Sequence, residues 1–331
     1  MKTIFFGTQP YDRESFDRIN ADYGIRIKYH RSHLNIDNVP LAQGADAVCI
    51  FVNDSADAPT VGELARMGVR LIALRCAGFN NVDLKAAAEH GITVVRVPAY
   101  SPYAVAEHAV ALMLSLNRKV HRAYWRTRDG NFALHGLLGF DMHGKTAGIV
   151  GTGKIARALI RILRGFGMEV LGYDPCPDEA FARESGMTYV PLAELYRRSD
   201  IISLHCPLTD QTRHMIDAEA IGQMKDGVII INTGRGQLIR TSDLIEGLKE
   251  KKIGAAGLDV YEEEVDYFYQ DTSDRIMDDD MLARLLSFNN VILTSHQGFF
   301  TREALDNIAR TTLENIQAFS HGECLNEVKY K

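Results

Sequence analysis

Short apolar runs alternate with longer amphipathic segments through the first hundred residues. The runs are rich in β-branched and aromatic residues, which is typical of strands, and the segments between them have helical spacing. This alternation predicts a parallel sheet whose strands are joined by helical crossovers. The expected strands are 3–6, 26–30, 47–53, 70–75 and 93–97, and the expected helices lie near 10–21, 59–67 and 83–90.

A second series of apolar runs follows a long helix that is expected to begin after Ser101, at Pro102. Serine caps helices and proline suits their first turn. The runs beyond this helix are almost continuously apolar, as expected for strands that are covered on both faces. They occupy 146–150, 169–174, 201–205, 228–232, 255–260 and 290–295, and a last helix is expected at 301–319.

The two series predict an α/β protein with two Rossmann-like or flavodoxin-like domains, whose parallel sheets are separated by a cleft. The length of 331 residues agrees with two domains, since one domain typically takes roughly 150 residues. The stretch 262–280 contains nine acidic residues and one basic residue, and we interpret it as a solvated loop. It lacks the spacing of a calcium-binding loop.

Composition and charge exclude several classes of protein. The net charge of −6 gives the chain no attraction to the phosphates of a nucleic acid. No run approaches the ~18 apolar residues of a membrane span. The odd number of cysteines, without metal-ligand spacing, predicts free thiols in a reducing compartment and no metal site. We therefore expect a cytoplasmic protein with neither a nucleic-acid nor a membrane partner.

A glycine-rich turn lies between the strand expected at 146–150 and the helix that follows it. Gly151, Gly153 and Ala156 have the spacing G-x-G-x-x-A. Gly151 would make the tight turn, and Gly153 would let the backbone approach a pyrophosphate. Lys154 and Ile155 would offer N–H groups at the start of the helix. The alternative is a glycine turn in another kind of α/β protein, but strand, turn and helix together favour a dinucleotide site.

An acidic residue stands where this type of site needs one. Asp174 ends the next expected strand, 23 residues after Gly151. A carboxylate there accepts hydrogen bonds from ribose hydroxyls and repels a 2′-phosphate, so NAD is predicted rather than NADP. Because a whole α/β unit precedes the turn, we assign residues 1–100 plus 297–331 to a substrate (catalytic) domain and 101–296 to the NAD-binding Rossmann domain.

Three residues suited to the reduction of a 2-keto acid follow three expected strands. Arg235 follows 228–232, a glutamate cluster at 262–264 follows 255–260, and His296 follows 290–295. Arginine binds a carboxylate in two-point fashion, histidine can protonate a carbonyl oxygen, and a carboxylate can orient the histidine. Taken singly, Arg235 could be a cation of a surface loop, the glutamates could belong to the acidic stretch, and His296 could be a core residue. Their occurrence together at successive strand ends favours a catalytic role.

The sequence resembles the D-isomer-specific 2-hydroxyacid dehydrogenase family over nearly its whole length. The resemblance is carried by GTGKIA with Asp174, LHCPLT (204–209), INTGRG (231–236), GLDVYEEE (257–264) and the segment at His296. Family spacing selects Glu264 from the glutamate cluster and implies that Arg235, Glu264 and His296 are catalytic. The resemblance also implies NAD contacts from Cys206, Pro207, Thr212, Thr233, Gly234 and Asp259.

Three further segments look like those of fermentative D-lactate dehydrogenases: RCAGFNNVD (75–83), VPAYSP (97–102) and HQGFFT (296–301). This implies that the backbone of Gly78 and Phe79 binds the substrate carboxylate and that Tyr100 and Phe299 lie near the substrate. The implied reaction is the stereospecific reduction of pyruvate to D-lactate by NADH. Two departures, Ser295 for a common proline and Gly298 for a larger residue, leave the preferred substrate size open.

Two alternatives remain open from the sequence. One is another D-2-hydroxyacid dehydrogenase, for example one that acts on D-2-hydroxyisocaproate, phosphoglycerate or glyoxylate. The other is a non-enzymatic protein that senses NAD, since the family fold also serves corepressors. The resemblance further implies a homodimer or a dimer of dimers, formed through the NAD-binding domain.

Overall fold

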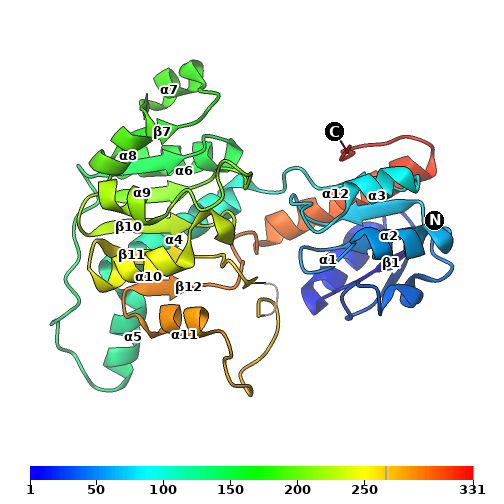
Figure 1. Cartoon of the computed structure of the whole chain (residues 1–331), viewed down its shortest axis with the longest axis horizontal. Coiled ribbons are helices and arrows are strands. Elements are labelled where there is room, and N and C mark those ends of the chain that lie inside the picture. Colours follow the sequence, from blue (N-terminus) through cyan, green and yellow to red (C-terminus); the bar gives the residue numbers. More distant parts are fainter. Residues whose placement is uncertain (265–266, 331) are drawn as a thin grey trace. The chain divides into compact units, whose positions relative to one another are not determined.

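The computed structural model describes residues 1–264 and 267–330, which form two compact units (Figure 1). The first contains Met1–Ser101 and the C-terminal segment from Phe300 onward, and the second is Pro102–Phe299. Each unit is built on one parallel sheet with helices on its faces, so the predicted fold class of two α/β domains is confirmed. The chain returns to the first unit at Phe300, three residues beyond the expected position of 297.

The first unit has five parallel strands in the order β2-β1-β3-β4-β5. Its helices cover both faces, and α12 packs on α1 and β4. On that face the rings of Phe5 and Phe16 meet edge to face at 4.8 Å. The strands are β1 (Lys2–Phe5), β2 (Arg26–Tyr29), β3 (Ala47–Ile50), β4 (Leu71–Leu74) and β5 (Thr93–Val95), and the helices are α1 (Pro10–Asn20), η1 (Val39–Ala42), α2 (Ala58–Arg66), α3 (Leu84–Glu89) and α12 (Arg302–Ser320).

All five strands predicted for this unit are present, but the one expected at 47–53 ends at Ile50. The buried carboxylate of Asp54 accepts the backbone N–H groups of Phe51 and Leu34, both at 2.6 Å. These bonds turn the chain out of the sheet, and such a local side-chain to backbone bond competes with strand pairing.

The second unit has seven parallel strands in the order β12-β11-β10-β9-β6-β7-β8. The order reverses direction beside β6, which is the type of position at which α/β sheets bind ligands. The strands are β6 (Thr146–Val150), β7 (Glu169–Tyr173), β8 (Thr188–Tyr189), β9 (Ile201–Leu204), β10 (Val228–Asn232), β11 (Ile253–Leu258) and β12 (Val291–Leu293).

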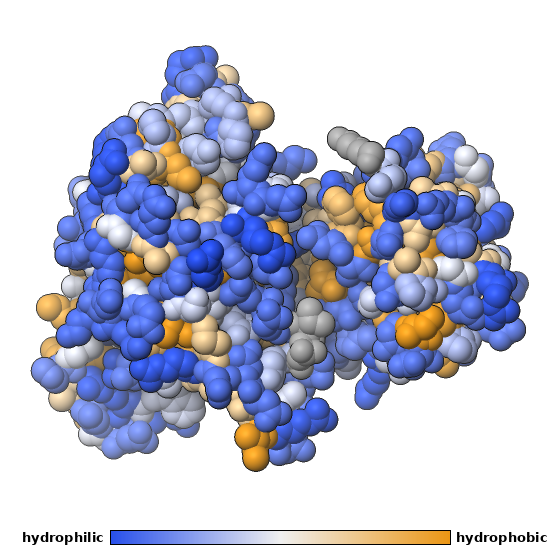
Figure 2. Space-filling view, viewed as in Figure 1, coloured by the Kyte–Doolittle hydropathy of each residue, from blue (hydrophilic) through white to orange (hydrophobic). Residues whose placement is uncertain are grey.

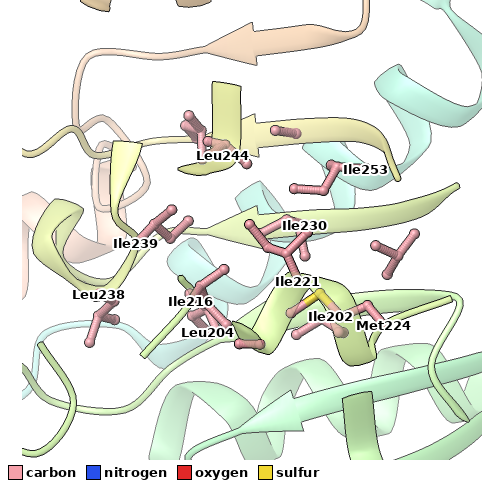
Figure 3. Packing of buried hydrophobic residues seen from close by; sticks show 14 of the residues in the cluster. Ile202, Leu204, Ile216, Ile221, Met224, Ile230, Leu238, Ile239, Leu244 and Ile253 are labelled. Carbon is pink, nitrogen blue, oxygen red and sulfur yellow. The ribbon is translucent and has the colours of Figure 1, made fainter. Parts of the chain in front are cut away.

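Alternate residues of these strands enter separate cores on the two faces of the sheet. Ile202 and Ile230 point toward the face covered by α8, α9 and α10 (Figure 3), whereas Ile201 and Ile229 pack with α4 and α6. Burial on both faces explains the continuous apolar runs in the sequence. The helices are α4 (Pro102–Arg118), α5 (Val120–Arg128), α6 (Lys154–Gly165), α7 (Glu179–Ser185), α8 (Leu192–Arg198), α9 (Ala218–Gln223), η2 (Gly236–Leu238), α10 (Thr241–Lys249) and α11 (Asp280–Ser287).

Polar side chains cover most of the surface that Figure 2 shows, with small apolar patches among them. In the part of the chain that the structure describes, no helix is both long enough and apolar enough to cross a lipid bilayer. Likewise, no group of three or more His, Cys, Asp or Glu side chains among residues 1–264 and 267–330 is placed to hold a metal ion.

Candidate active site

Arg235, Glu264 and His296 lie beyond the carboxyl ends of β10, β11 and β12. These three strands are neighbours in the sheet and run parallel, so their carboxyl ends meet at one edge. The topology therefore gathers at one edge of the second unit three residues that are separated by up to 61 positions in the sequence. This is the edge at which open α/β sheets carry their active residues.

Glu264 and His296 form a close pair. Nδ1 of His296 lies 2.9 Å from Oε1 of Glu264, and the two side chains are 16% and 17% exposed. The other oxygen of Glu264 accepts the backbone N–H of Tyr261 at 3.0 Å. With both carboxylate oxygens bonded, Glu264 can hold the imidazole in one orientation and leave Nε2 as the nitrogen that faces a reactant.

The three glutamates of the cluster have different surroundings. Glu262 pairs with Nε2 of His214 at 2.7 Å and accepts the N–H of Thr241 at the start of α10, also at 2.7 Å. Glu263 is exposed. Of the three, Glu264 is the one that forms a hydrogen bond with His296. It is also the glutamate that the family spacing implies to be catalytic.

The backbone around His296 is fixed by buried partners. The sequence singled out one of them, Asp259, as an implied NAD contact, but not Thr294 or His108. The Asp259 carboxylate, 1% exposed, accepts the N–H groups of Gln297 and Gly298 at 2.9 and 2.7 Å and the hydroxyl of Thr294. The Asp259 carbonyl also accepts the N–H of His296, whose φ is +53°. Residues other than glycine adopt this left-handed conformation infrequently, and here the bonds to Asp259 hold it in place.

His108, on α4, completes this arrangement. Its Nε2 lies 3.0 Å from Oγ1 of Thr294 and 3.2 Å from Oδ1 of Asp259. Burial alone raises the pKa of the Asp259 carboxyl, but hydrogen bonds from His108 and Thr294 lower it below its ordinary value. The sequence offered one signal for His108: a polar residue on the buried stripe of an otherwise apolar helix.

The acidic stretch 262–280 is not simply a solvated loop, although residues 265–266 lie outside the described residues. Phe268 is 4% exposed and packs into the core of the second unit. The hydroxyl of Tyr269 donates to the carbonyl oxygen of His296 at 2.9 Å. The interpretation of the whole stretch as solvated was therefore wrong, because Phe268 packs into the core and Glu262 and Glu264 are largely buried in pairs with histidines.

The loop that carries Arg235 packs against the segment that leads to Glu264. Nη1 of Arg235 donates to the Gly234 carbonyl at 2.8 Å, and the Arg235 carbonyl accepts from the Asn232 amide at 2.9 Å. A Cβ on Gly236 would lie 2.0 Å from the Tyr261 carbonyl oxygen. Only glycine allows this contact, so the residue next to Arg235 has a steric reason to be glycine.

The glycine-rich turn has the geometry of an anion site. Gly151 follows β6 with φ +86°, and a Cβ there would meet the Cys206 backbone nitrogen at 2.6 Å. Space is open around Gly153, the N-cap of α6, where no side chain caps the helix. Lys154 and Ile155 begin that helix, so uncapped N–H groups and open space meet there, which fits a pyrophosphate.

Asp174 lies just past β7 and is held by three donors. It accepts the N–H and hydroxyl of Thr152 at 2.7 and 3.1 Å and the N–H of Cys176 at 2.9 Å. Burial by itself raises the pKa of Asp174, yet the bonds from Thr152 and Cys176 lower it below the ordinary value. The carboxylate is thus ionised and fixed beside the glycine turn, where it fits a ribose.

The remaining residues implied as NAD contacts belong to the same unit. Pro207 and Thr212 share one loop, in which the Thr212 hydroxyl donates to the Pro207 carbonyl at 2.7 Å. Thr233 is 9% exposed, and its hydroxyl has no hydrogen-bond partner among the described residues. Gly234 donates its N–H to Asn232 at 3.0 Å. A buried hydroxyl without a partner is unusual and is consistent with a ligand group that satisfies it.

The residues implied as substrate contacts fall in both units. Gly78 and Phe79 lie in the loop after β4. There the Arg96 guanidinium lies over the Phe79 ring, with Cζ 5.2 Å from the ring centroid. The Tyr100 carbonyl accepts from the Asn307 side chain at 2.7 Å. Phe299, 7% exposed, belongs to the second unit. The structure thus brings Phe299 into the same unit as Arg235, Glu264 and His296.

Comparisons with known proteins show the family and the fold of the chain. Residues 110–298 match the model of the D-isomer specific 2-hydroxyacid dehydrogenase NAD binding domain. The chain is 51% identical to the D-lactate dehydrogenase of Escherichia coli K12, over 99% of this chain and all of that protein. It resembles the apo-structure of D-lactate dehydrogenase from Escherichia coli with a TM-score of 0.91, covering 99% of this chain and 100% of that one at 50% identity. Against D-lactate dehydrogenase with NAD⁺ from Lactobacillus jensenii the TM-score is 0.84, at 31% identity and full coverage of both chains.

Proposed function

Because the chain belongs to the D-isomer-specific 2-hydroxyacid dehydrogenase family, we propose that it is an NAD-dependent D-lactate dehydrogenase that reduces pyruvate to D-lactate. One observation carries this proposal. The Glu264–His296 pair, joined at 2.9 Å, stands at the strand edge that also bears Arg235. A proton donor, the group that orients it and a carboxylate receptor are the protein groups that the reaction needs.

NAD is the coenzyme that the second unit fits. The uncapped start of α6 suits the pyrophosphate, and Asp174 suits the ribose. The Thr233 hydroxyl, which has no hydrogen-bond partner among the described residues, suits a polar group of the coenzyme. When bound, the coenzyme supplies the hydride that reduces the keto carbon. Cys206, Pro207, Thr212, Gly234 and Asp259 are proposed as further contacts from the family resemblance.

The reaction assigns one task to each residue. Arg235 binds the carboxylate of pyruvate through its planar fork of N–H groups. His296 donates the proton on Nε2 to the carbonyl oxygen as the keto carbon receives its hydride, so that the oxygen becomes the hydroxyl of lactate. Glu264, on Nδ1, fixes the ring orientation and stabilises the imidazolium before the proton leaves.

The substrate residues are assigned in the same way. From the family resemblance, the N–H groups of Gly78 and Phe79 are proposed as contacts of the substrate carboxylate, and Tyr100 and Phe299 are proposed to limit the room for the substrate side chain. A small, methyl-sized side chain is favoured because the identity to a D-lactate dehydrogenase extends over the whole chain. The alternative is a larger D-2-hydroxyacid such as D-2-hydroxyisocaproate. Gly298 offers no added room for it, because a Cβ there would lie 2.9 Å from the Asp259 carboxylate.

A panel of 2-keto acids tests the proposal. NADH oxidation is followed with pyruvate, 4-methyl-2-oxopentanoate, hydroxypyruvate and glyoxylate, and the product is resolved by chiral chromatography. We expect the highest kcat/KM with pyruvate and only the D-isomer of lactate. A preference for 4-methyl-2-oxopentanoate would contradict the substrate, and L-lactate would contradict the stereochemistry. Binding of NADH without turnover of any keto acid would favour an NAD sensor instead.

The chain is further proposed to act in the cytoplasm as a homodimer or a dimer of dimers. Its cysteines Cys49, Cys76, Cys176, Cys206 and Cys324 are all free thiols, as suits a reducing compartment. The helix α5 and the loop after it expose large apolar side chains, including Trp125 (64%), Phe132 (76%) and Leu138 (89%). Such a patch is typical of an interface, and light scattering coupled to gel filtration should give at least twice the chain mass.

A further inference from the structure

A hydrogen-bonded network connects Asp174 to a second acidic residue, Asp178. The Thr152 hydroxyl, which donates to Asp174, also lies 2.8 Å from the Tyr189 hydroxyl. The Tyr189 hydroxyl in turn accepts the N–H of Asp178 at 3.1 Å. Asp178 is the N-cap of α7, where its side chain accepts the N–H groups of Ala180 and Phe181.

An arginine lies at the centre of this network. Arg157, in the first turns of α6, donates from Nη2 to Oδ2 of Asp178 at 2.8 Å and from Nε to the Thr152 carbonyl at 3.1 Å. Its guanidinium also lies over the Phe181 ring, with Cζ 4.8 Å from the ring centroid. Bonds on two sides and an aromatic face thus hold the guanidinium where it is, beside the residue that binds Asp174.

The positive charge of Arg157 reaches the proposed ribose site. Its attraction is one of the causes that lower the pKa of Asp174. A 2′-phosphate would replace one of the ribose hydroxyls that Asp174 is proposed to bind. It would therefore bring its negative charge both against Asp174 and within the field of Arg157. In dinucleotide sites that accept NADP, a nearby arginine receives this phosphate.

We propose that Asp178 is a second determinant of coenzyme choice, because it engages Arg157 and denies a 2′-phosphate the cation that would otherwise receive it. This inference rests on the proposed binding of NAD and extends it. Discrimination against NADP would then have two parts: repulsion by Asp174, and the pairing of Arg157 with Asp178. Substitutions at Asp178 or Arg157 can change this pairing while the residues that are proposed to contact NAD stay the same.

A simpler interpretation is that Arg157 only ties α6 to α7, and the chain contains a matched control for it. Arg161, one turn further along α6, pairs with Glu184 of α7 at 3.0 Å and also lies over Phe181, at 5.2 Å. It makes the same kind of tether, but its recorded partner is Glu184, whereas Arg157 also donates to the carbonyl of Thr152, the residue that binds Asp174. Arg161→Gln therefore removes a tether and leaves the proposed specificity device intact.

The test measures binding rather than turnover. The dissociation constants of NADH and NADPH are determined by calorimetry for the wild type, Asp178→Asn, Arg157→Gln, their double variant and Arg161→Gln. Asparagine is as good an N-cap as aspartate, so Asp178→Asn removes the charge and keeps the helix cap. Asp178→Ser, another capping residue without charge, serves if that variant does not fold.

In Asp178→Asn the ratio of the NADPH to the NADH dissociation constant should fall roughly fivefold, as expected for one partly exposed charge pair. The fall should vanish when Arg157→Gln is added, and Arg161→Gln should keep the wild-type ratio. An unchanged ratio in Asp178→Asn and Asp178→Ser, or a fall that survives the loss of Arg157, would overturn the inference while the proposed function stands. A wild-type protein that binds no NADH would overturn both.

Discussion

Gly236→Ala probes the contact between the Arg235 loop and the Glu264 segment. The added methyl carbon would lie 2.0 Å from the Tyr261 carbonyl oxygen and 2.5 Å from the Glu262 nitrogen. Non-bonded heavy atoms settle above 3 Å, so the loop and the segment must separate by about 1 Å. The clashing atoms belong to the backbone and cannot rotate away, so the displacement must reach Arg235, Glu264 or both.

A displacement of this size has a calculable effect on catalysis. Misplacement of catalytic groups by about 1 Å costs roughly 100-fold in rate, or about 2.7 kcal/mol in the activation free energy. We therefore expect the kcat/KM for pyruvate reduction to fall about 100-fold in Gly236→Ala. The dissociation constant of NADH should change less than kcat/KM. The glycine turn and Asp174 lie after other strands, β6 and β7, and only the proposed NAD contacts of the displaced loop and segment, Thr233, Gly234 and Asp259, are affected.

Gly222→Ala is the matched control. Gly222 is exposed within α9, and a Cβ there would meet nothing within 4 Å. Alanine should stabilise that helix by up to about 1 kcal/mol and leave catalysis at the wild-type level. Circular dichroism and thermal melting establish that both variants are folded. A folded Gly236→Ala protein with wild-type kcat/KM would refute the idea that this contact sets the geometry of the site.

Three further predictions concern single side chains. Glu264→Gln keeps a hydrogen-bonding side chain but removes its charge, so kcat near neutral pH should fall about 100-fold; an unchanged kcat would remove Glu264 from the mechanism. His108→Phe leaves the buried Asp259 carboxylate without its imidazole, so the protein should lose about 1–3 kcal/mol of stability together with kcat, and an unchanged melting temperature would contradict this. Burial lowers the pKa of His205 from 6.5 to about 4, so the folded state resists protonation and the protein loses stability as the pH drops below the pKa of the unfolded state. Between about pH 7 and about pH 5, His205 should cost ~2 kcal/mol of the free energy of unfolding. The urea midpoint of His205→Gln should therefore fall less over that range than the midpoint of the wild type.

The pattern of apolar residues predicted most of the fold because strands that are buried on both faces leave a strong signal. Each predicted strand in both units is present, with ends that differ by a few residues. The two-residue strand β8 (Thr188–Tyr189) and the helix α5 were not predicted, and no ranges were predicted for the helices α7 to α11. The first is too short to show a period, and no residue of the second is buried, so it lacks an apolar face turned toward a core.

The site was predictable where a residue follows directly on a strand. Arg235 and His296 were proposed in this way and do follow β10 and β12, and family spacing selected Glu264 from three adjacent glutamates. Contacts made between distant elements were not predictable, for example that of His108 with Thr294. Such contacts depend on the register and packing of whole elements, which no local pattern in the sequence encodes.

The most direct test of the proposed proton donor is a crystal structure with NADH and oxamate, an unreactive analogue of pyruvate. We expect Nε2 of His296 to lie within hydrogen-bonding distance of the oxamate carbonyl oxygen and Arg235 to bind the oxamate carboxylate. Glu264 should remain on Nδ1 of His296. Oxamate bound away from these residues, or His296 turned away from the carbonyl oxygen, would contradict the assignment of the proton donor.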